Sequence, residues 1–592
     1  MECDSKGIVI SADFRDKELC KMIPGARWSA EEKVWRTPLS WSSCKALRGV
    51  FGARLEIGPD LMQWATEMRV NYIDPLLKLR LELDDEAVGQ YEPRLYPFQR
   101  AGVAWLSLAR RALLADEMGT GKTIQTIVAL RLAHARGLLP DGPIAIICPN
   151  AMKNTWAREF ATWWPERRPV VIGGAAASRR AAFDAVEKDE ADVLIAHWEV
   201  LRFHSRLAGY GSIALKDDEK QDKEFNFIPW VAVVGDEAHK LKNPQSKQTR
   251  AAWAIAHQKT VRYRFALTGT PIGNAPHDMW SILHFIDPIE FASKTRFVDR
   301  YCLVSWNSFG GLDVIGVKPE TAEEFYSVVD PHMRRMPKAL VLRDLPPKLG
   351  GIEKPIVRYL EMNAKQAKAY EQMVDRMVAQ LDNDDVVITT NPIAQLTRLM
   401  QFASAYAEIN TEGDLRLTDP SNKVEALMDL LDEMGDEPLV VFAQSRQLIE
   451  LAAKVLEKEK ITHSLLVGGQ SDVERQRNID DFQQGRVRVI LCTVAAGGVG
   501  VTLTRARVLC FLQRSFSMID NKQAEDRVHR IGSEIHDTVE IIDFVSEGTV
   551  DERVIDVLRG KGEKLEEIVR DKATLRTLLT GGVTKTKKGR RK

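Results

Sequence analysis

The stretch RRALLADEMGTGKTIQTIVAL, residues 110–130, joins a short apolar run, a glycine-rich turn and a helical repeat of apolar residues. The run at 110–116 is typical of a buried parallel strand. After the turn, apolar residues recur at helical spacing as far as Gly137, where a helix can end. Such a turn binds phosphate groups, because free N–H groups and the positive end of the helix dipole meet there.

The turn contains the residue types that a nucleotide requires. Gly119 and Gly121 let the backbone approach phosphate oxygens, Lys122 can reach the terminal phosphates, and Thr123 can ligate magnesium. Asp116 departs from the usual phosphate-loop pattern, because a glycine is expected at its position. The stretch therefore predicts nucleotide binding, and a purely structural turn is the alternative.

A second apolar run, WVAVVGDEAHK at 230–240, supplies the other half of a nucleotide site. Asp236 at the tip of such a strand can hold magnesium, and Glu237 beside it can orient and deprotonate the attacking water. A surface acidic turn is the weaker interpretation, because a phosphate-binding turn precedes this run in the sequence by about the length of a domain, and both stand at the end of a strand.

Further strands predict a second α/β part without a phosphate loop. RYRFALTGTPIGN ends a third strand in a Thr-Gly-Thr-Pro turn, and PLVVFAQSRQ, VRVILCTVAAGGVGVTLT and RVLCFLQRSFS alternate with helical stretches. In QAEDRVHRIGS, Arg527 and Arg530 lie three residues apart and would share one face of a helix. They are candidates for fingers that reach a nucleotide across a cleft, or they form a surface charge pair.

Length and composition narrow the class of protein. The 592 residues carry 83 basic and 83 acidic side chains, and seven cysteines without a CxxC pair. Several domains are expected, in a reducing compartment. The start lacks a signal peptide and no apolar run reaches the roughly 18 residues of a membrane span, so neither secretion nor a membrane partner is expected. The tail at 585–592 has six basic residues and no acid, which suits a solvated end or a phosphate contact.

The motifs together resemble the Snf2 family within the superfamily 2 helicases. In order they are LYPFQRAGVAWL, DEMGTGKT, IICPNAMKNTWAREF, DEAH, LTGTP, LVVFAQSRQ, CTVAAGGVGVTLT and QAEDRVHRIGS, and the similarity spans roughly residues 93–560. Asp116 belongs to this family's own form of the loop. The chain departs from the family at Thr120 for Leu, Thr502 for Asn, Ser533 for Gln and RSFSM for the segment WNP, which leaves the nucleotide chemistry in place.

The resemblance implies an α/β fold with two tandem RecA-like lobes, helical Snf2-type insertions and a small N-terminal α+β module. It implies ATP and Mg²⁺ as cofactors, bound between the lobes, and DNA lying across both. DNA-backbone contacts are expected from segments 148–159, 196–201, 268–271, 443–447 and 493–502. The site residues that it implies are Glu237, Arg527, Arg530 and Lys122 for catalysis; Phe98, Gln99, Met118, Gly119, Thr120, Gly121, Lys122, Thr123 and Gln523 for the nucleotide; and Thr123 and Asp236 for the metal.

The N-terminus resembles the HARP-type module of the annealing-helicase branch of this family. GARWSAEEKVWRTPL, residues 25–39, predicts a hairpin with Trp28 and Trp35 beside a polar turn. The module would grip branched or single-stranded DNA with its aromatic rings and with basic residues such as Arg27, Lys33 and Arg36. Alternatively, the two tryptophans only form the core of a small accessory domain.

The expected domains follow the chain in order. They are the HARP-like module at 1–58, a helical connector at 59–92, lobe 1 at 93–290, Snf2-type helical insertions at 291–415, lobe 2 at 416–550, C-terminal helices at 551–580 and a basic tail at 581–592.

The sequence thus predicts an ATP-dependent translocase on double-stranded DNA, a DNA-dependent ATPase that remodels or re-anneals branched DNA. A strand-separating helicase, a chromatin-type remodeller and an ATP-gated recruitment factor without translocation are the alternatives. We expect a monomeric motor, located in the cytoplasm or nucleoid of a prokaryotic or viral system or in a eukaryotic nucleus. The sequence does not indicate its protein partners.

Overall fold

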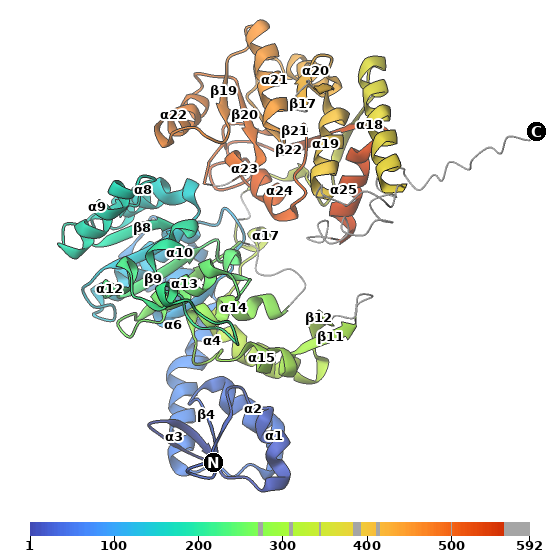
Figure 1. The fold of residues 1–592 in the computed structure, drawn as a ribbon. Coiled ribbons are helices and arrows are strands. Elements are labelled where there is room, and N and C mark those ends of the chain that lie inside the picture. The colour runs from blue at the N-terminus through green and yellow to red at the C-terminus, as the bar shows by residue number, and fades with distance from the viewer. Residues whose placement is uncertain are drawn as a thin grey trace, which may run out of the picture. The chain divides into compact units, whose positions relative to one another are not determined.

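The computed structural model describes residues 1–269, 276–306, 312–342, 345–382, 392–409, 415–498 and 500–561. The chain forms two compact units, unit 1 (Met1–Arg343) and unit 2 (Asp344–Lys592), which Figure 1 draws as ribbons. The predicted basic tail and most of the predicted C-terminal helices lie outside the described residues, as do residues 270 and 271 of the LTGTP motif.

Unit 1 is built on a seven-stranded sheet whose strands all run parallel. The strands predicted before the phosphate loop, at DEAH and at LTGTP are confirmed and lie side by side in its centre. In spatial order the sheet contains β13 (Met333–Arg334), β5 (Arg111–Leu114), β10 (Tyr263–Leu267), β9 (Ala232–Asp236), β6 (Ile144–Cys148), β8 (Val193–His197) and β7 (Pro169–Val171).

Helices cover both faces of this sheet, which explains why its strands are apolar throughout. Ala112 and Leu114 of β5 pack in the cluster on one face, and Leu113 packs in the cluster on the other. A parallel sheet needs cover on both faces because its crossover helices lie there. The first face is covered by α6 (Pro97–Ala109), α7 (Lys122–Ala135) and α8 (Lys153–Trp163), and the second by α9 (Ala176–Glu187), α10 (Leu201–His204), α13 (Lys247–Ala256) and α14 (Pro276–Ile286).

The predicted connector at 59–92 is helical, and its second half belongs to the core of unit 1. It contains α3 (Pro59–Met68), a short π-helical turn (Arg69–Ile73), α4 (Asp74–Leu81) and α5 (Glu86–Tyr91). Leu76 and Val88 are buried in the same cluster as α6 and α7.

Unit 2 contains a second sheet, also parallel, with the predicted strands in its centre. Its strands alternate between two clusters, with Val441 facing one and Val440 facing the other. The predicted fold class, two tandem RecA-like α/β lobes, is therefore confirmed. In spatial order the strands are β14 (Lys348–Gly350), β22 (Val539–Ser546), β21 (Val508–Phe511), β18 (Leu439–Ala443), β20 (Val489–Thr493) and β19 (His463–Leu466), and β15 (Ile356–Leu360) pairs with the second half of β22.

The predicted insertion segment at 291–415 contributes helices to both units. In unit 1 it forms α15 (Lys294–Tyr301), α16 (Ala322–Val329) and α17 (Lys338–Val341), with the hairpin β11 (Cys302–Trp306) and β12 (Leu312–Val317). In unit 2 it forms α18 (Ala364–Asp382), α19 (Pro392–Ser404) and β16 (Tyr406–Ile409), which pairs with β17 (Leu415–Thr418). The helices α18 and α19 lie side by side, and α19 contacts α25 (Val550–Lys561) (Figure 1).

The N-terminal module is a four-stranded antiparallel sheet with helices, so the predicted α+β module is confirmed. Its strands are ordered β1 (Glu2–Asp4), β2 (Gly7–Ile10), β4 (Val34–Thr37) and β3 (Arg27–Ser29), with α1 (Lys17–Lys21) and α2 (Trp41–Phe51). In the predicted hairpin Trp28 pairs directly with Trp35, and the two rings meet edge to face at 5.7 Å. Trp35 is 9% exposed and belongs to the core, whereas Trp28 is 51% exposed. The core interpretation therefore holds for Trp35 and fails for Trp28.

A buried glutamate side chain attaches this module to the rest of unit 1. Glu290 lies after α14, and its side chain accepts hydrogen bonds from the backbone N–H groups of Trp41 (3.0 Å) and Ser42, at the start of α2. It thereby satisfies helix N–H groups that have no partner within the helix. The Ser42 hydroxyl donates to the Glu290 carbonyl at 2.8 Å, and the Trp41 indole N–H donates to the Ser327 carbonyl at 3.3 Å.

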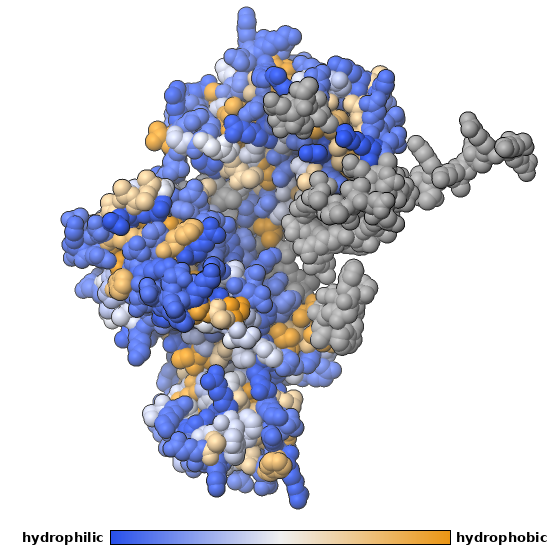
Figure 2. Space-filling view, viewed as in Figure 1, coloured by the Kyte–Doolittle hydropathy of each residue, from blue (hydrophilic) through white to orange (hydrophobic). Residues whose placement is uncertain are grey.

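The visible surface is mixed in character. Figure 2 shows hydrophilic residues over most of this face, with hydrophobic residues scattered among them. Within the described residues, no helix combines the length and the apolar character needed to cross a membrane.

The Glu290 contact predicts a pH dependence of stability. Burial, with a smaller contribution from Asp287, raises the pKa of Glu290 to about 8, against roughly 4.3 in an unfolded chain. The folded state therefore holds a proton that the unfolded state has released. The resulting stabilisation is complete below the unfolded value and is lost as the pH rises through 8. Thermal unfolding of the full chain should show a midpoint that falls between about pH 5 and pH 8 and levels off above that, and this fall should be smaller in Glu290→Gln. An identical pH dependence in both proteins would contradict the assignment.

Candidate active site

The two halves of the predicted nucleotide site meet at the carboxyl ends of the central strands of the unit 1 sheet. Leu267 of β10 pairs with Leu114 of β5 on one side and with Asp236 of β9 on the other. The phosphate loop starts directly after Leu114. Neighbouring strands lie about 4.8 Å apart, so the start of the loop and Asp236 are roughly 10 Å apart at the carboxyl ends of their strands.

The backbone of the loop has the conformation that phosphate binding requires. Gly119 and Gly121 have φ angles of 76° and 78°, in the left-handed region that favours glycine. Gly121 is the residue before α7, a helix of 14 residues, so the loop amides lie at the helix N-terminus. A Cβ atom on Gly121 would lie only 2.4 Å from Nε2 of Gln99. A side chain at this position would therefore be strained and would displace the Gln99 amide.

Asp116 has a structural role, which explains why the loop does not need a glycine there. Its side chain is fully buried; Oδ2 accepts from Arg334 Nη1 and Gln125 Nε2, both at 3.3 Å, and Oδ1 accepts from the backbone N–H of Met336 at 2.9 Å. Burial raises the pKa of Asp116, and the Arg334 charge opposes that shift. The carboxylate thereby joins the loop to α7 and to the edge strand β13.

The side chains within the loop differ in what they contact. Lys122 donates to the carbonyls of Asp116 (2.9 Å) and Glu117 (3.1 Å), so its ammonium group lies over the loop. Thr120 is fully buried and its hydroxyl donates to the Glu117 carbonyl at 2.8 Å. Met118 is 5% exposed, and a Cβ atom on Gly269 would lie 2.3 Å from its Cγ. Any contact of Met118 or Thr120 with phosphate must therefore come from the backbone N–H groups.

Gln99 and Phe98, predicted to lie at the adenine, are both buried at the start of α6. The Gln99 side chain accepts from the Tyr96 N–H at 3.1 Å and donates to the Thr120 carbonyl at 3.0 Å. This amide therefore links α6 to the phosphate loop. Phe98 is 2% exposed, and the neighbouring ring of Tyr96, 6.2 Å away, is 43% exposed. The adenine contacts of Gln99 and Phe98 remain predictions, and Tyr96 presents the accessible aromatic surface.

Two tryptophans hold the strand tip at Asp236. The Trp156 indole N–H donates to Oδ2 of Asp236 at 2.9 Å, and the Trp198 indole N–H donates to its carbonyl at 2.8 Å. Glu237 follows with a φ of 52°, a left-handed conformation that a residue with a side chain rarely adopts. Its carboxylate lies 3.2 Å from Nδ1 of His239. The Asp236 carboxylate is thus held by an indole, whereas the Glu237 carboxylate lies beside the His239 ring.

The donor set at this edge fits a magnesium ion and a nucleotide. Mg²⁺ is usually bound by one or two carboxylates together with substrate phosphates, and no group of three or more His, Cys, Asp or Glu that could hold a metal occurs among the described residues. Asp236 is 7% exposed, and burial, followed by the neighbouring Glu237, raises its pKa to about 6. A cation would offset that desolvation. Asp236 and Thr123 would hold the ion, which would neutralise charge on the phosphates.

The predicted arginines of unit 2 converge on one carbonyl group. The helix α24 (Met518–Glu525) ends before them, so they lie in turns and share no helix face. Nevertheless Nη1 of Arg527 and Nη1 of Arg530 each donate to the Val501 carbonyl at 3.2 Å. Arg527 is 8% exposed and its Nε also donates to the Gln523 carbonyl at 2.7 Å, whereas Arg530 is only partly buried. Gln523, predicted to lie beside the nucleotide, is 5% exposed.

A buried ion network stands where RSFSM replaces the family's usual segment. Arg514 donates two hydrogen bonds to Asp543, at 2.7 and 3.0 Å, and one to Glu525 at 2.5 Å. Glu525 also accepts from the backbone N–H of Ile352 at 2.8 Å and from Lys348 at 3.1 Å. Since Glu525 is the last residue of α24, this network fixes the point from which the chain turns toward Arg527.

Sequence reasoning missed four residues that shape the two sites. Arg334 lies more than 200 positions after Asp116 and stands beside a second arginine, so nothing in the sequence distinguishes the buried one. The indole partners of Asp236 lie 80 and 38 positions away. A buried indole N–H needs an acceptor, but the chain does not indicate which acceptor it finds. The missed residues are Trp156, Trp198, Arg334 and Arg514.

Comparison with known families assigns the chain. The family model "SNF2-related domain" matches residues 98–412, more than half of the chain, and "Helicase conserved C-terminal domain" matches residues 422–532. The chain belongs to the SNF2 family of helicase-like ATPases. The predicted resemblance to this family is therefore confirmed.

Relatives of this SNF2-family chain are remote and longer. It is 29% identical over 496 residues to "Chromodomain-helicase-DNA-binding protein 1-like" of Danio rerio, covering 80% of this chain and 44% of the relative. It is 27% identical over 497 residues to the "ISWI chromatin-remodeling complex ATPase ISW1" of Saccharomyces cerevisiae, covering 80% of this chain and 40% of the relative. It thus spans less than half the length of either protein.

A solved structure is also similar. It is the Sulfolobus solfataricus SWI2/SNF2 ATPase core in complex with dsDNA, 24% identical, with 82% of this chain and 97% of that chain covered and a TM-score of 0.37.

Glu237→Gln should separate hydrolysis from binding. The glutamine cannot accept the proton of the attacking water, whereas Lys122 and the loop amides remain to hold phosphates. Steady-state ATP turnover should fall by roughly 10² to 10⁴, the usual contribution of a general base. Affinity for a fluorescent ATP analogue should be unchanged. Normal turnover in the variant would remove Glu237 from the mechanism.

Arg530→Ala should lose most DNA-stimulated turnover with little loss of DNA affinity. Arginine fingers in phosphoryl transfer contribute about 10³ to 10⁵ in rate. Lys522→Ala is the matched control, because Lys522 is a cation of α24 that pairs with exposed Glu353 at 2.7 Å. Arg527→Ala should in addition lower the unfolding temperature, since this side chain is buried and bonded to two carbonyls. A variant at Arg530 that lost DNA binding but kept its rates would place this arginine on a different surface.

Proposed function

We propose that the chain is an ATP-driven translocase on double-stranded DNA that acts on branched DNA. One observation carries the ATPase part: in a chain of the SNF2 family, the phosphate loop follows β5 and Asp236-Glu237 lies at the end of β9, and these two strands flank β10 in one parallel sheet. The ATP-gated recruitment factor is disfavoured, because a switch without turnover has no need for the hydrolytic set at Glu237, Arg527 and Arg530.

In this proposal each residue has one part in ATP hydrolysis. The loop amides and Lys122 bind the phosphates, and Asp236 and Thr123 hold magnesium, which offsets phosphate charge. Glu237 takes the proton of a water whose oxygen bonds to the γ-phosphorus. The bond from that phosphorus to the bridging oxygen of ADP breaks, and phosphate leaves. Arg530 stabilises the charge on the transferred group.

DNA is the proposed track of the motor. The Danio rerio relative is named a helicase-DNA-binding protein. Membership of the SNF2 family also supports a nucleic-acid substrate. We place the DNA contacts in the segments that the motifs indicate, including residues 148–159 of unit 1 and 443–447 of unit 2. Such contacts go to the phosphate backbone, and they permit movement with little sequence preference.

A groove beside the N-terminal module supports the preference for branched DNA. It has a volume of about 980 Å³ and is lined by residues of β3, β4 and the segment 289–296. The exposed ring of Trp28 lies in it, and so do Arg27 and Arg296, which pair with none of the described carboxylates. An exposed aromatic ring beside cations suits an unpaired base and its phosphate. Unpaired bases occur at the junctions of branched DNA.

Remodelling of protein–DNA complexes is the second candidate. The yeast relative is named a chromatin-remodeling complex ATPase. The chain matches 40% of that protein, so the remaining 60% of the relative offers no comparison. Displacement of streptavidin from biotinylated duplex, with release of a paired strand measured in parallel, distinguishes remodelling from strand separation.

The parallel measurement of ATP turnover with several nucleic acids tests the proposed function. Duplex DNA should stimulate turnover, forked DNA should stimulate it further, and RNA should not. If none of the four nucleic acids (duplex, forked and single-stranded DNA, and RNA) changed the rate of ATP turnover, the chain would not be a DNA motor. Stimulation by RNA alone would move it to another class of helicase-like ATPase.

Trp28→Ala should remove the preference for forks and leave stimulation by plain duplex intact. Stacking of one base on an aromatic ring contributes about 1–3 kcal/mol, and Trp28→Phe should keep part of it. Because Trp28 is exposed, its loss leaves the core of the module in place. Trp35→Ala is the folding control, since Trp35 is in that core and its loss should unfold the module. An unchanged fork preference in Trp28→Ala would locate the preference elsewhere.

A further inference from the structure

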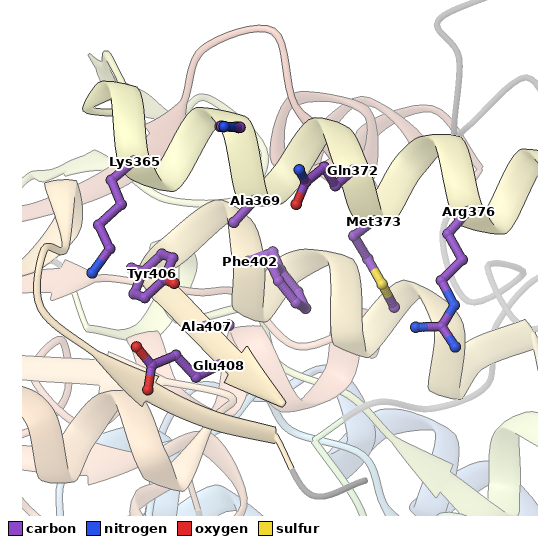
Figure 3. Close-up of a pocket in the computed structure, with 10 residues that line it drawn as sticks. Lys365, Ala369, Gln372, Met373, Arg376, Phe402, Tyr406, Ala407 and Glu408 are labelled. Atoms are coloured by element: carbon purple, nitrogen blue, oxygen red, sulfur yellow. The ribbon is translucent and has the colours of Figure 1, made fainter. Parts of the chain in front are cut away.

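Unit 2 has a second groove, on the helical insertion and outside the motifs that the proposed function uses. It has a volume of about 710 Å³ and lies along α18, with α19 and β16 on its other side. Figure 3 shows Lys365 and Arg376 toward opposite ends of the groove, with Met373 and Phe402 between the helices. The remaining lining residues include Lys368, Ala369, Gln372, Tyr406, Ala407 and Glu408.

The cations of α18 follow one stripe of the helix. Lys365, Lys368 and Arg376, together with Gln372, are separated by three or four residues and are all exposed, so they fall on the same helix face. Two exposed acids of this helix, Glu371 and Asp375, line no described part of the groove. The charges of α18 are therefore segregated, and the positive face borders the groove.

Little in the described structure neutralises this stripe. Lys365 lies 3.8 Å from the centre of the Tyr406 ring, a cation–π contact that keeps its charge. No ion pair joins Lys368 or Arg376 to a carboxylate in the part of the chain that the structure describes. Among the described residues of the lining, Glu408 is the one carboxylate, against three cations. A ligand in this groove meets a net positive charge.

The arrangement of the cations favours a long ligand. From Lys365 to Arg376 the helix advances by 11 residues, about 16 Å at 1.5 Å per residue. A small anion needs convergent donors, whereas a line of donors suits a polymer with repeated negative charges. Met373 and Phe402 are only 8% and 5% exposed, so the apolar floor offers little surface for the anchoring side chains of a protein partner.

We propose that this groove binds the phosphate backbone of DNA as an additional contact of unit 2. The inference rests on the proposed function, because DNA is the polyanion on which the motor acts. Lys368 and Arg376 each pair with a phosphate, and Gln372 between them donates a further hydrogen bond. The contact carries no sequence information; it adds affinity that depends on salt.

The test removes two cations from the full chain. Lys368→Gln with Arg376→Gln keeps good helix formers and leaves the Lys365–Tyr406 contact in place. The matched control is Lys454→Gln with Lys458→Gln, two exposed cations of α21 (Arg446–Lys458). The helix α21 starts beside the carboxyl end of β18 and runs back along the sheet, so these lysines are distant from the motif loops. Duplex binding is measured by fluorescence anisotropy from 50 to 200 mM salt, with basal and stimulated ATP turnover.

The groove variant should bind duplex more weakly than wild type, and the negative slope of log K against log salt should become shallower by about 1.8, or 0.9 for each lost phosphate contact. Its basal turnover should be unchanged and the control should match wild type. If wild type binds duplex and is stimulated by it, but groove variant and control share one slope, the groove proposal is overturned and the proposed function stands. If wild type neither binds duplex nor responds to it, both are overturned. Unchanged duplex binding with lost affinity for a fluorescent poly-glutamate peptide would assign the groove to an acidic protein partner instead.

Discussion

The contact between the buried carboxylate of Asp116 and the buried guanidinium of Arg334 is the constraint on which the nucleotide site depends. Neither side chain has any exposed surface. Loss of one member of such a pair leaves an uncompensated buried charge and typically costs 3–5 kcal/mol. The phosphate loop continues directly from this carboxylate. The shape of the loop therefore depends on the edge strand β13, which lies more than 200 residues later in the sequence. The backbone N–H of Ala115 also donates to the Arg334 carbonyl at 2.7 Å, which strengthens the same connection.

Unit 2 also contains a buried arginine that is paired with carboxylates. Arg514 is buried between Asp543 and Glu525, and it also lies 3.8 Å from the centre of the Phe511 ring. In both units a buried arginine fixes the chain just beside the residues proposed for chemistry. The loops themselves are rich in glycine and polar residues and have few apolar side chains to hold them. Buried ion pairs provide that rigidity where a hydrophobic core cannot.

The sequence predicts the elements of this site well, and it predicts their partners poorly. The strands ending at Leu114, Asp236 and Leu267 carry local signals, namely apolar runs followed by glycines or acids, and each is found where expected. Contacts such as Glu290 with α2 join residues about 250 positions apart, and no local pattern encodes them. The same limit applies to exposure: Trp28 and Trp35 are identical in type, and only the packing of the folded module makes one core and the other surface. Arg527 and Arg530 would share one face if their segment were helical, but spacing alone cannot show that α24 ends at Glu525.

The attachment of α2 to Glu290 also has a mechanical meaning. The N-terminal module is joined to the rest of unit 1 by hydrogen bonds at a helix end, in addition to its chain connection. The groove and the phosphate loop therefore belong to the same compact unit. In a motor of the proposed kind, a DNA strand bound to the module would move together with unit 1. The module would then set the position of the junction of a branched DNA relative to unit 1 when each ATP is hydrolysed.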